Sequence, residues 1–281
     1  MKKGLIMEGG AMRGMFTAGV IDVMMEHGIA LDGAIGVSAG AAFGCNYKSR
    51  QIGRVIRYNT RFCSDRRYGG FHVLLKTGDY YSKEFCYEEV PTIHDPFDYD
   101  AYQRNPMEFY VVCTDVDTGR AEYHRYEGRH DYGLEWIRAS ASMPLVSRMV
   151  EIGGRKFLDG ALADSIPIKF FESIGYDRNI VILTQPLGFQ KKKDTLLPQM
   201  KLWYRNYPEL VKSMVTRDIQ YNESLRYIRR REETGNLLVI RPPHKLPISR
   251  TEKNPKKLRQ VYEIGRRVAE SRMEEIKAYL T

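Results

Sequence analysis

The sequence LDGAIGVSAGAAFGC (residues 31–45) combines an apolar run ending at Val37, a serine and a run of small residues. Ser38 stands between Gly36 and Gly40, the spacing of a nucleophile elbow, in which a strand turns sharply into a helix. In so tight a turn, side chains two residues either side of the serine would collide. The pattern therefore predicts an exposed hydroxyl at a helix N-terminus, where N–H groups stabilise negative charge. Taken alone, the motif also fits a glycine-rich turn in which the serine only caps the helix.

A second unit of strand, turn and helix opens the chain. Residues 4–7 are apolar, residues 8–14 (EGGAMRG) break the run, and apolar side chains then recur at helical spacing as far as Met24. Because the carboxyl ends of parallel strands meet at one sheet edge, we expect this loop to lie near Ser38 and to form an oxyanion hole. Its expected donors are the N–H groups of Gly9, Gly10 and Ala11, assisted by the guanidinium of Arg13.

Nucleotide binding is the rival function for this loop. A phosphate-binding P-loop needs Lys and then Ser or Thr after its last glycine, whereas Gly14 is followed by Met15 and Phe16. The dinucleotide fingerprint needs spaced rather than adjacent glycines. Neither nucleotide motif fits the sequence.

Asp159 is the third candidate, in the sequence FLDGA (residues 157–161). An aspartate before glycine usually marks a turn, so this dipeptide alone favours a structural role. The upstream segment ASASMP (residues 139–144) is suited to close packing beneath an active site. Its Ser140 and Ser142 lack the flanking glycines of an elbow and are predicted to be structural.

Four motifs together resemble, in order, those of the patatin-like phospholipase family. They are the loop of residues 9–14, the elbow of residues 36–40, residues 139–144 and residues 159–161. The resemblance covers residues 4 to about 168 and implies an α/β fold, with a mainly parallel central sheet between two helical layers. It also implies a catalytic dyad of Ser38 and Asp159 that hydrolyses lipid acyl esters without a metal or other cofactor. Glu8 departs from the aspartate frequent in the family, a change we expect to be tolerated because the N–H donors follow it.

A histidine is the alternative to an aspartate base. The ordinary pKa of an aspartate, about 4, makes it a poor acceptor, so a dyad requires a dry site that raises this pKa. Among the histidines only His244 follows Asp159, which would give the Ser, Asp, His order of an α/β-hydrolase triad. Such hydrolases place several strands before the nucleophile, whereas Ser38 follows the second predicted strand. The dyad is favoured and the triad stays open.

The chain is predicted to be one domain over residues 1–281, with a basic helical insertion at 188–233 and a closing helix at 255–280. Of the net charge of +9, residues 189–281 carry +11, from 22 Lys and Arg against 11 Asp and Glu, and residues 1–188 carry −2. Runs such as KKK at 191–193 usually form a solvated helix face. For a lipid enzyme they favour peripheral contact with an anionic membrane. No recognised nucleic-acid-binding module is present.

Periodicity gives a coarse map of the remaining elements. Strands are expected over residues 108–114, 121–126, 150–157, 179–184 and 236–241, and helices over 166–174, 196–231 in pieces and 255–279. Residues 61–105 are expected to be irregular or short-helical and to cover the substrate. The apolar stretch after Lys3 is too short for a signal peptide, and no run could span a bilayer, so we expect a cytoplasmic or peripheral enzyme.

The function predicted from these observations is a lipid acyl-ester hydrolase of the phospholipase A or lysophospholipase kind. An acyltransferase or thioesterase using the same dyad is the enzymatic alternative. A basic protein that binds lipid or a membrane surface without catalysis is the other alternative.

Overall fold

The central strands bury side chains on both faces, as strands covered by helices on each side must. In β1 (Lys2–Met7), Leu5 and Met7 belong to the larger apolar core and Ile6 to the smaller one across the sheet. The same alternation in β7 (Tyr176–Ile182) sends Ile180 and Val181 to opposite faces. A strand buried on both faces is typical of a parallel sheet.

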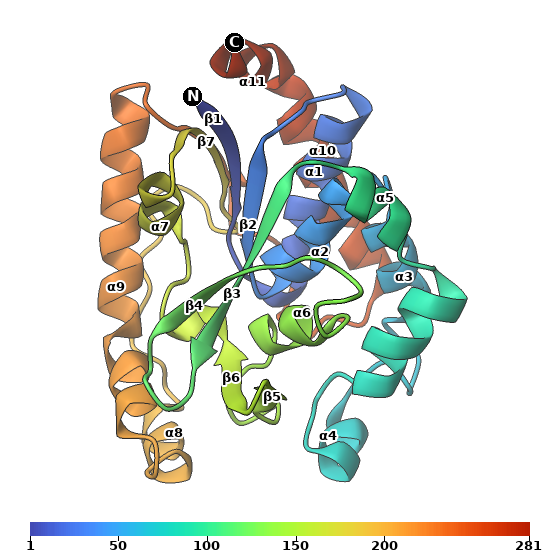
Figure 1. Cartoon of the computed structure of the whole chain (residues 1–281), viewed down its shortest axis with the longest axis vertical. Coiled ribbons are helices and arrows are strands. Elements are labelled where there is room, and N and C mark those ends of the chain that lie inside the picture. The colour runs from blue at the N-terminus through green and yellow to red at the C-terminus, as the bar shows by residue number, and fades with distance from the viewer.

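The computed structural model describes residues 1–281 and contains one eight-stranded sheet (Figure 1). The other strands are β2 (Gly33–Val37), β3 (Glu108–Asp115), β4 (Ala121–Arg125), β5 (Val150–Ile152), β6 (Arg155–Asp159) and β8 (Leu238–Ile240). The strand order is β5-β6-β3-β2-β1-β7-β8, and β4 pairs with β3. Strands β3, β2, β1, β7 and β8 are parallel, whereas β4 and the β5–β6 hairpin are antiparallel. The mainly parallel α/β sheet predicted from the sequence is confirmed.

Helices cover both faces of this sheet (Figure 1). The larger core lies beneath α1 (Met15–Glu26), α2 (Ala39–Lys48), α3 (Arg54–Phe62), α6 (Glu135–Ser140), α10 (Pro255–Ser271) and α11 (Met273–Leu280). The smaller core lies beneath α7 (Ile168–Ser173) and the 26-residue helix α9 (Pro208–Glu233). Short elements complete the chain: α4 (Phe71–Thr77), α5 (Tyr99–Arg104), α8 (Leu197–Trp203), the π-helix η2 (Glu84–His94) and the 3-10 turns η1 (Ala11–Gly14) and η3 (Gly160–Leu162).

Two predicted elements differ from those observed. The strand expected over residues 150–157 is a hairpin, because Gly153 and Gly154 adopt φ of 57° and 76° and reverse the chain. The helix expected at 255–280 is two helices, since Arg272 leaves helical geometry at φ −115°, ψ 10°. The strands expected at 108–114, 121–126, 179–184 and 236–241 form with shifted ends. The single-domain organisation stays a prediction.

No helix of the structure has both the length and the apolar character needed to cross a membrane.

Candidate active site

The elbow predicted at Ser38 joins β2 directly to α2. Ser38 has φ 55° and ψ −122°, a strained conformation for a residue with a side chain, and it precedes the first turn of α2. A side chain at Gly36 would overlap the backbone of Gly40, and one at Gly40 would overlap the carbonyl group of Met7. The turn therefore closes because both flanking residues are glycine.

Two buried serines in the segment of residues 139–144 contact the candidate catalytic residues, Ser140 at the strained turn and Ser142 at Asp159. The hydroxyl of Ser140 accepts the N–H of Ser38 at 2.8 Å and donates to the carbonyl oxygen of Val112 at 2.6 Å. The carbonyl oxygen of Ser142 accepts the N–H of Asp159 at 2.8 Å. The segment thus fixes both the elbow and Asp159, in agreement with the structural role predicted for its serines.

Asp159 ends β6 and contacts Ser38 directly. The Oγ of Ser38 donates a 2.7 Å hydrogen bond to Oδ2 of Asp159, and the N–H of Ala161 donates a 2.8 Å bond to Oδ1. The two residues are 6% and 3% exposed. Burial raises the pKa of the Asp159 carboxyl above its ordinary value, against the opposing effect of the hydrogen bond from Ser38. The site therefore meets the requirement for a dry, more basic carboxylate.

The glycine-rich loop between β1 and η1 approaches Ser38 closely. A Cβ on Gly9 would lie 2.9 Å from the Cβ of Ser38, so the backbone can come this near only without a side chain. The N–H groups of Gly9, Gly10 and Ala11 donate to no protein acceptor. Free N–H groups beside a serine hydroxyl can hold an oxyanion, which is the use predicted for this loop.

Glu8 fixes this loop and takes no part in an ion pair. Its Oε1 accepts the hydroxyl of Tyr221 on α9 at 2.6 Å, and its Oε2 accepts the N–H of Thr184 at 2.6 Å and the hydroxyl of Thr184 at 3.1 Å. The hydroxyl of Thr184 also donates to the carbonyl oxygen of Gly9 at 3.2 Å. Glu8 thus ties the loop to both neighbouring elements, a role that the sequence analysis did not assign.

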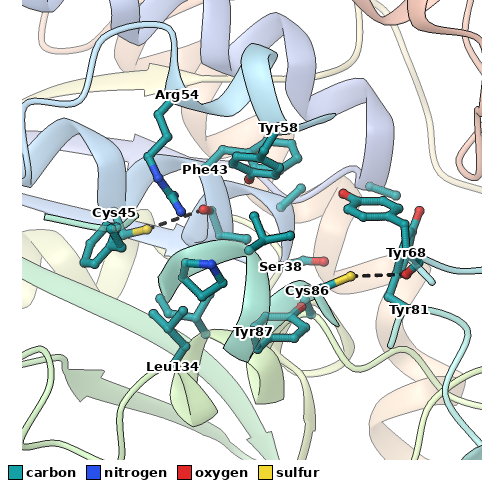
Figure 2. A pocket seen from close by; sticks show the side chains of 18 of the residues that line it. Ser38, Phe43, Cys45, Arg54, Tyr58, Tyr68, Tyr81, Cys86, Tyr87 and Leu134 are labelled. Carbon is teal, nitrogen blue, oxygen red and sulfur yellow. Dashed lines mark hydrogen bonds between the residues drawn. The ribbon is translucent and has the colours of Figure 1, made fainter. Parts of the chain in front are cut away.

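An apolar cavity of about 120 Å³ opens at Ser38, and 17 of its 20 lining residues are hydrophobic. Engineered apolar cavities of about 150 Å³ bind benzene, so this volume admits several carbons of an acyl chain. Figure 2 shows Tyr58, Tyr68, Tyr81 and Tyr87 around Ser38. Residues 61–105, the segment predicted to form part of a substrate cover, include all of these tyrosines except Tyr58 and supply seven of the 20 lining residues.

Arg54 is the charged residue of this wall, and the protein neutralises it internally. Its guanidinium donates to Oδ1 of Asn46 at 3.0 Å and twice to the carbonyl oxygen of Asp95, at 3.0 and 2.7 Å, and its Nε lies 3.6 Å from the Asp95 carboxylate. The cavity therefore offers an acyl chain no free charge, as a binding site for hydrocarbon requires.

A second cavity also reaches Ser38 and has the opposite character. Ser38, Ala11 and Met143 line both cavities. The cationic residues of the second are Arg13, Lys191, Arg217 and Arg250. Arg13 thus lines the same cavity as Ser38, and its predicted assistance to the oxyanion hole stays a prediction. Arg217 and Arg250 were missed because neither belongs to a motif, and Lys191 was assigned to the surface with Lys192 and Lys193.

His244, the candidate for a triad, lies away from both cavities. It is exposed on the loop after β8 and lines a separate surface cavity with Pro243. None of the residues that line the cavities at Ser38 is a histidine. In the structure, the group that accepts the Ser38 hydroxyl is the Asp159 carboxylate.

The chain is similar in sequence to several known proteins. The relatives include the uncharacterized protein YjjU of Escherichia coli K12, 25% identical over 283 residues that span 93% of this chain and 74% of YjjU. The lysophospholipase nte1 of Aspergillus niger is 27% identical over 260 residues, which span 85% of this chain but only 16% of the fungal protein. The crystal structure of VipD from Legionella pneumophila superposes with a TM-score of 0.44 at 12% identity, over 96% of this chain and 67% of VipD.

Two family models divide the chain. Residues 207–281 match a domain of unknown function (DUF6363). Residues 5–171, more than half of the chain, match the model described as patatin-like phospholipase, and this region contains the elbow, the glycine-rich loop and Asp159. The chain therefore belongs to the patatin-like phospholipase family.

Proposed function

We propose that this protein is a serine hydrolase that cleaves acyl esters of lipids, with Ser38 as nucleophile and Asp159 as base. The observation that carries the proposal is the 2.7 Å hydrogen bond from Ser38 to Asp159 at the mouth of an apolar cavity. Membership of the patatin-like phospholipase family and similarity to a part of the fungal lysophospholipases support a lipid substrate.

The first step is acylation of Ser38. Its Oγ attacks the ester carbonyl carbon while the hydroxyl proton passes to Oδ2 of Asp159, and the carbonyl oxygen becomes an oxyanion. The N–H groups of Gly9, Gly10 and Ala11, with the positive charge of Arg13, stabilise that oxyanion. Collapse of the intermediate expels the alcohol, which takes the proton from Asp159.

The second step is hydrolysis of the acyl enzyme. Asp159, again ionised, removes a proton from water, whose oxygen attacks the acyl carbon. The acyl group leaves as a carboxylic acid and Ser38 recovers its proton. An acyltransferase or thioesterase would differ only in the acceptor or the leaving group, so an added alcohol acceptor distinguishes transfer from hydrolysis.

We also propose that the end of the molecule bearing α4 and α8 rests on an anionic membrane surface. Both helices lie at the end toward which β1 and β2 run (Figure 1). Phe71 and Leu75 on α4 are 75% and 88% exposed, and Leu202 and Trp203 on α8 are 68% and 75% exposed. Apolar and aromatic side chains of this kind suit a membrane interface, and the exposed Lys192 and Lys193 add attraction to anionic lipids.

A fluorophosphonate probe and an ester panel test the catalytic proposal. The probe reacts with activated serines, so wild type should be labelled and Ser38→Ala should not. Wild type should hydrolyse nitrophenyl esters and lysophospholipids, and Ser38→Ala should not. Labelling that persists in Ser38→Ala, or equal hydrolysis by both proteins, would assign the chemistry elsewhere.

A further inference from the structure

The second cavity at Ser38 gathers positive charge that the protein itself does not neutralise. Arg13, Lys191, Arg217 and Arg250 line it, and none of the four forms an ion pair within 4.0 Å. Elsewhere many cations do pair, for example Arg266 with Glu26 at 2.7 Å and Arg155 with Asp115 at 2.8 Å. Charges removed from water normally require partners of opposite charge. The positive charge of this cavity therefore calls for an anion that the protein itself does not supply.

The carboxylates of the cavity are already engaged by neutral groups. Glu8 accepts hydrogen bonds from Tyr221 and Thr184, and Asp159 accepts them from Ser38 and Ala161. The Nε of Arg13 is buried and has no hydrogen-bond partner. Most buried donors in folded proteins have an acceptor, and an anion bound in this cavity would supply one for Arg13.

The cations are held in place by contacts with the catalytic loops. The Nε of Arg217 donates to the carbonyl oxygen of Ala161 at 2.6 Å, and Ala161 in turn donates to Asp159. The side-chain amide of Asn222 binds the backbone of Lys191. It accepts the backbone N–H of Lys191 at 2.8 Å and donates to the backbone carbonyl oxygen of Lys191 at 2.9 Å. The carbonyl oxygen of Arg250 accepts the N–H of Met12 at 3.4 Å. These bonds fix the guanidinium of Arg217 and the backbone of Lys191 and Arg250 relative to the dyad.

We propose that this cavity binds the head group of the substrate and selects a phosphomonoester, as in a monoacylglycerol phosphate. The proposal rests on the hydrolase function proposed above. A phosphomonoester carries a charge of about −1.5 to −2 at pH 7 and three acceptor oxygens. The four cations, less the charges of Glu8 and Asp159, leave a net charge of +2 to be balanced. A phosphocholine head group would instead bring a quaternary ammonium among these cations.

The two cavities would bind the two parts of such a substrate that lie on either side of its ester. Because Ser38, Ala11 and Met143 line both, an ester at Ser38 can direct its acyl chain into the apolar cavity and its polar part among the cations. In a monoacylglycerol phosphate only the glycerol backbone separates the ester from the phosphate. In an acyl thioester of coenzyme A a much longer arm separates the two groups.

Kinetics with matched substrates test the selection. Lysophosphatidate, lysophosphatidylcholine and acyl coenzyme A of one chain length are compared in neutral detergent micelles, with nitrophenyl butyrate as a reference that has no head group. Since a hydrogen bond to a charged group contributes roughly 1.5–3 kcal/mol, kcat/KM should favour lysophosphatidate over lysophosphatidylcholine by about tenfold or more. Lys191→Gln and Arg217→Gln should each remove most of that preference, measured relative to the reference ester.

Lys277→Gln is the control, because Lys277 is exposed on α11, away from the proposed membrane surface, and lines neither cavity. This variant should keep the preference for lysophosphatidate. Equal rates on both lysolipids, faster turnover of acyl coenzyme A, or an unchanged preference in both Lys191→Gln and Arg217→Gln would overturn the assignment while leaving the hydrolase intact.

Direct binding separates this inference from the proposed chemistry. Glycerol 3-phosphate should raise the melting temperature of Ser38→Ala, and should do so less in Ser38→Ala combined with Lys191→Gln. That result would support the anion site even if wild type hydrolysed no ester. Absence of any glycerol 3-phosphate effect on Ser38→Ala, together with hydrolysis by wild type, would refute the head-group site and retain the hydrolase.

Discussion

Ser38 and Asp159 lie 121 positions apart in the sequence, yet their side chains are joined by a 2.7 Å hydrogen bond. Adjacent strands create this proximity, since β2 and β6 both pair with β3. Ser38 follows the end of β2, and Asp159 opposes Cys113 in the register of β3 and β6. The pairing of both strands with β3 thus brings the two residues of the proposed dyad together.

Gly10→Ala is expected to reduce turnover strongly. The φ of Gly10 is 177°, which any residue can adopt, but a Cβ there would lie 2.8 Å from Oγ1 of Thr184. Relief of that contact would shift the N–H donors, and loss of one oxyanion donor typically costs about 100- to 1000-fold in kcat. Nitrophenyl ester kinetics measure the loss, and a thermal melt verifies the fold. Full activity in a normally folded variant would make the loop structural.

The fall in activity on the acid side of the pH profile should reflect protonation of the Asp159 carboxylate. Activity requires the ionised carboxylate, so it falls as pH drops through the pKa of Asp159, which burial raises above the ordinary value of about 3.9. The positive charge of Lys191 opposes this rise. In Lys191→Gln this fall in kcat/KM for a nitrophenyl ester should therefore move to higher pH, whereas Lys192→Gln should leave it in place. A fall that does not move in Lys191→Gln would contradict this electrostatic coupling.

Head-group preference should depend on pH through a different residue. Burial, with the charges of Arg217, Arg250 and Arg13, lowers the pKa of Lys191 to about 8, while Glu8 acts in the opposite direction. Lys191 is thus charged below that pH, and a phosphomonoester loses its second proton near pH 6. The ratio of kcat/KM for lysophosphatidate to that for lysophosphatidylcholine should be greatest between about pH 6 and 8. A ratio that stays constant from pH 6 to 10 would argue against a role of Lys191 in recognition.

Membrane contact is expected to depend on α8 and the lysines before it. Each basic residue near an anionic surface contributes about 1 kcal/mol, so the double variant of Lys192→Gln and Lys193→Gln should bind anionic vesicles roughly tenfold or more weakly. Added salt should weaken wild type similarly, and Trp203→Ser should reduce binding that persists in salt. Sedimentation measures this, with Lys277→Gln as control, because Lys277 belongs to α11, the helix at the opposite end of the molecule from α8 (Figure 1). Vesicle binding that is unchanged in these variants and in added salt would contradict the proposal that the end of the molecule bearing α4 and α8 contacts the membrane.

The sequence could predict the residues that local geometry constrains. Glycine is required at position 36 by the turn itself and at position 40 by the close approach of β1, so the motif that predicts the elbow can be read from the sequence. Asp159 was found by its place among the family's motifs, because an aspartate before glycine otherwise indicates only a turn. Element types followed from periodicity, whereas the hairpin at Gly153 and the break at Arg272 concern boundaries, where local signals are weakest.

The cationic cavity could not be predicted, because its residues converge only in the folded chain. Arg217 is one of six basic residues in the long polar helix α9, and Arg250 lies in a loop between β8 and α10. Lys191 was grouped with Lys192 and Lys193 by composition, yet it lines the cavity at Ser38, and Asn222 holds its backbone there. A run of basic residues forms a solvent-exposed surface only when every side chain in it faces solvent. Here Lys191 lines the cavity instead.

Turnover of Asp159→Asn compared with Ser38→Ala tests the proposed dyad most directly. The amide cannot accept the serine proton, so Asp159→Asn should fall to the background of Ser38→Ala while keeping a normal melting temperature. His244→Ala should stay within about tenfold of wild type, a loss of no more than roughly 1.4 kcal/mol in transition-state stabilisation. A well-folded His244→Ala at the background of Ser38→Ala, or substantial turnover by Asp159→Asn, would contradict a Ser38 and Asp159 dyad.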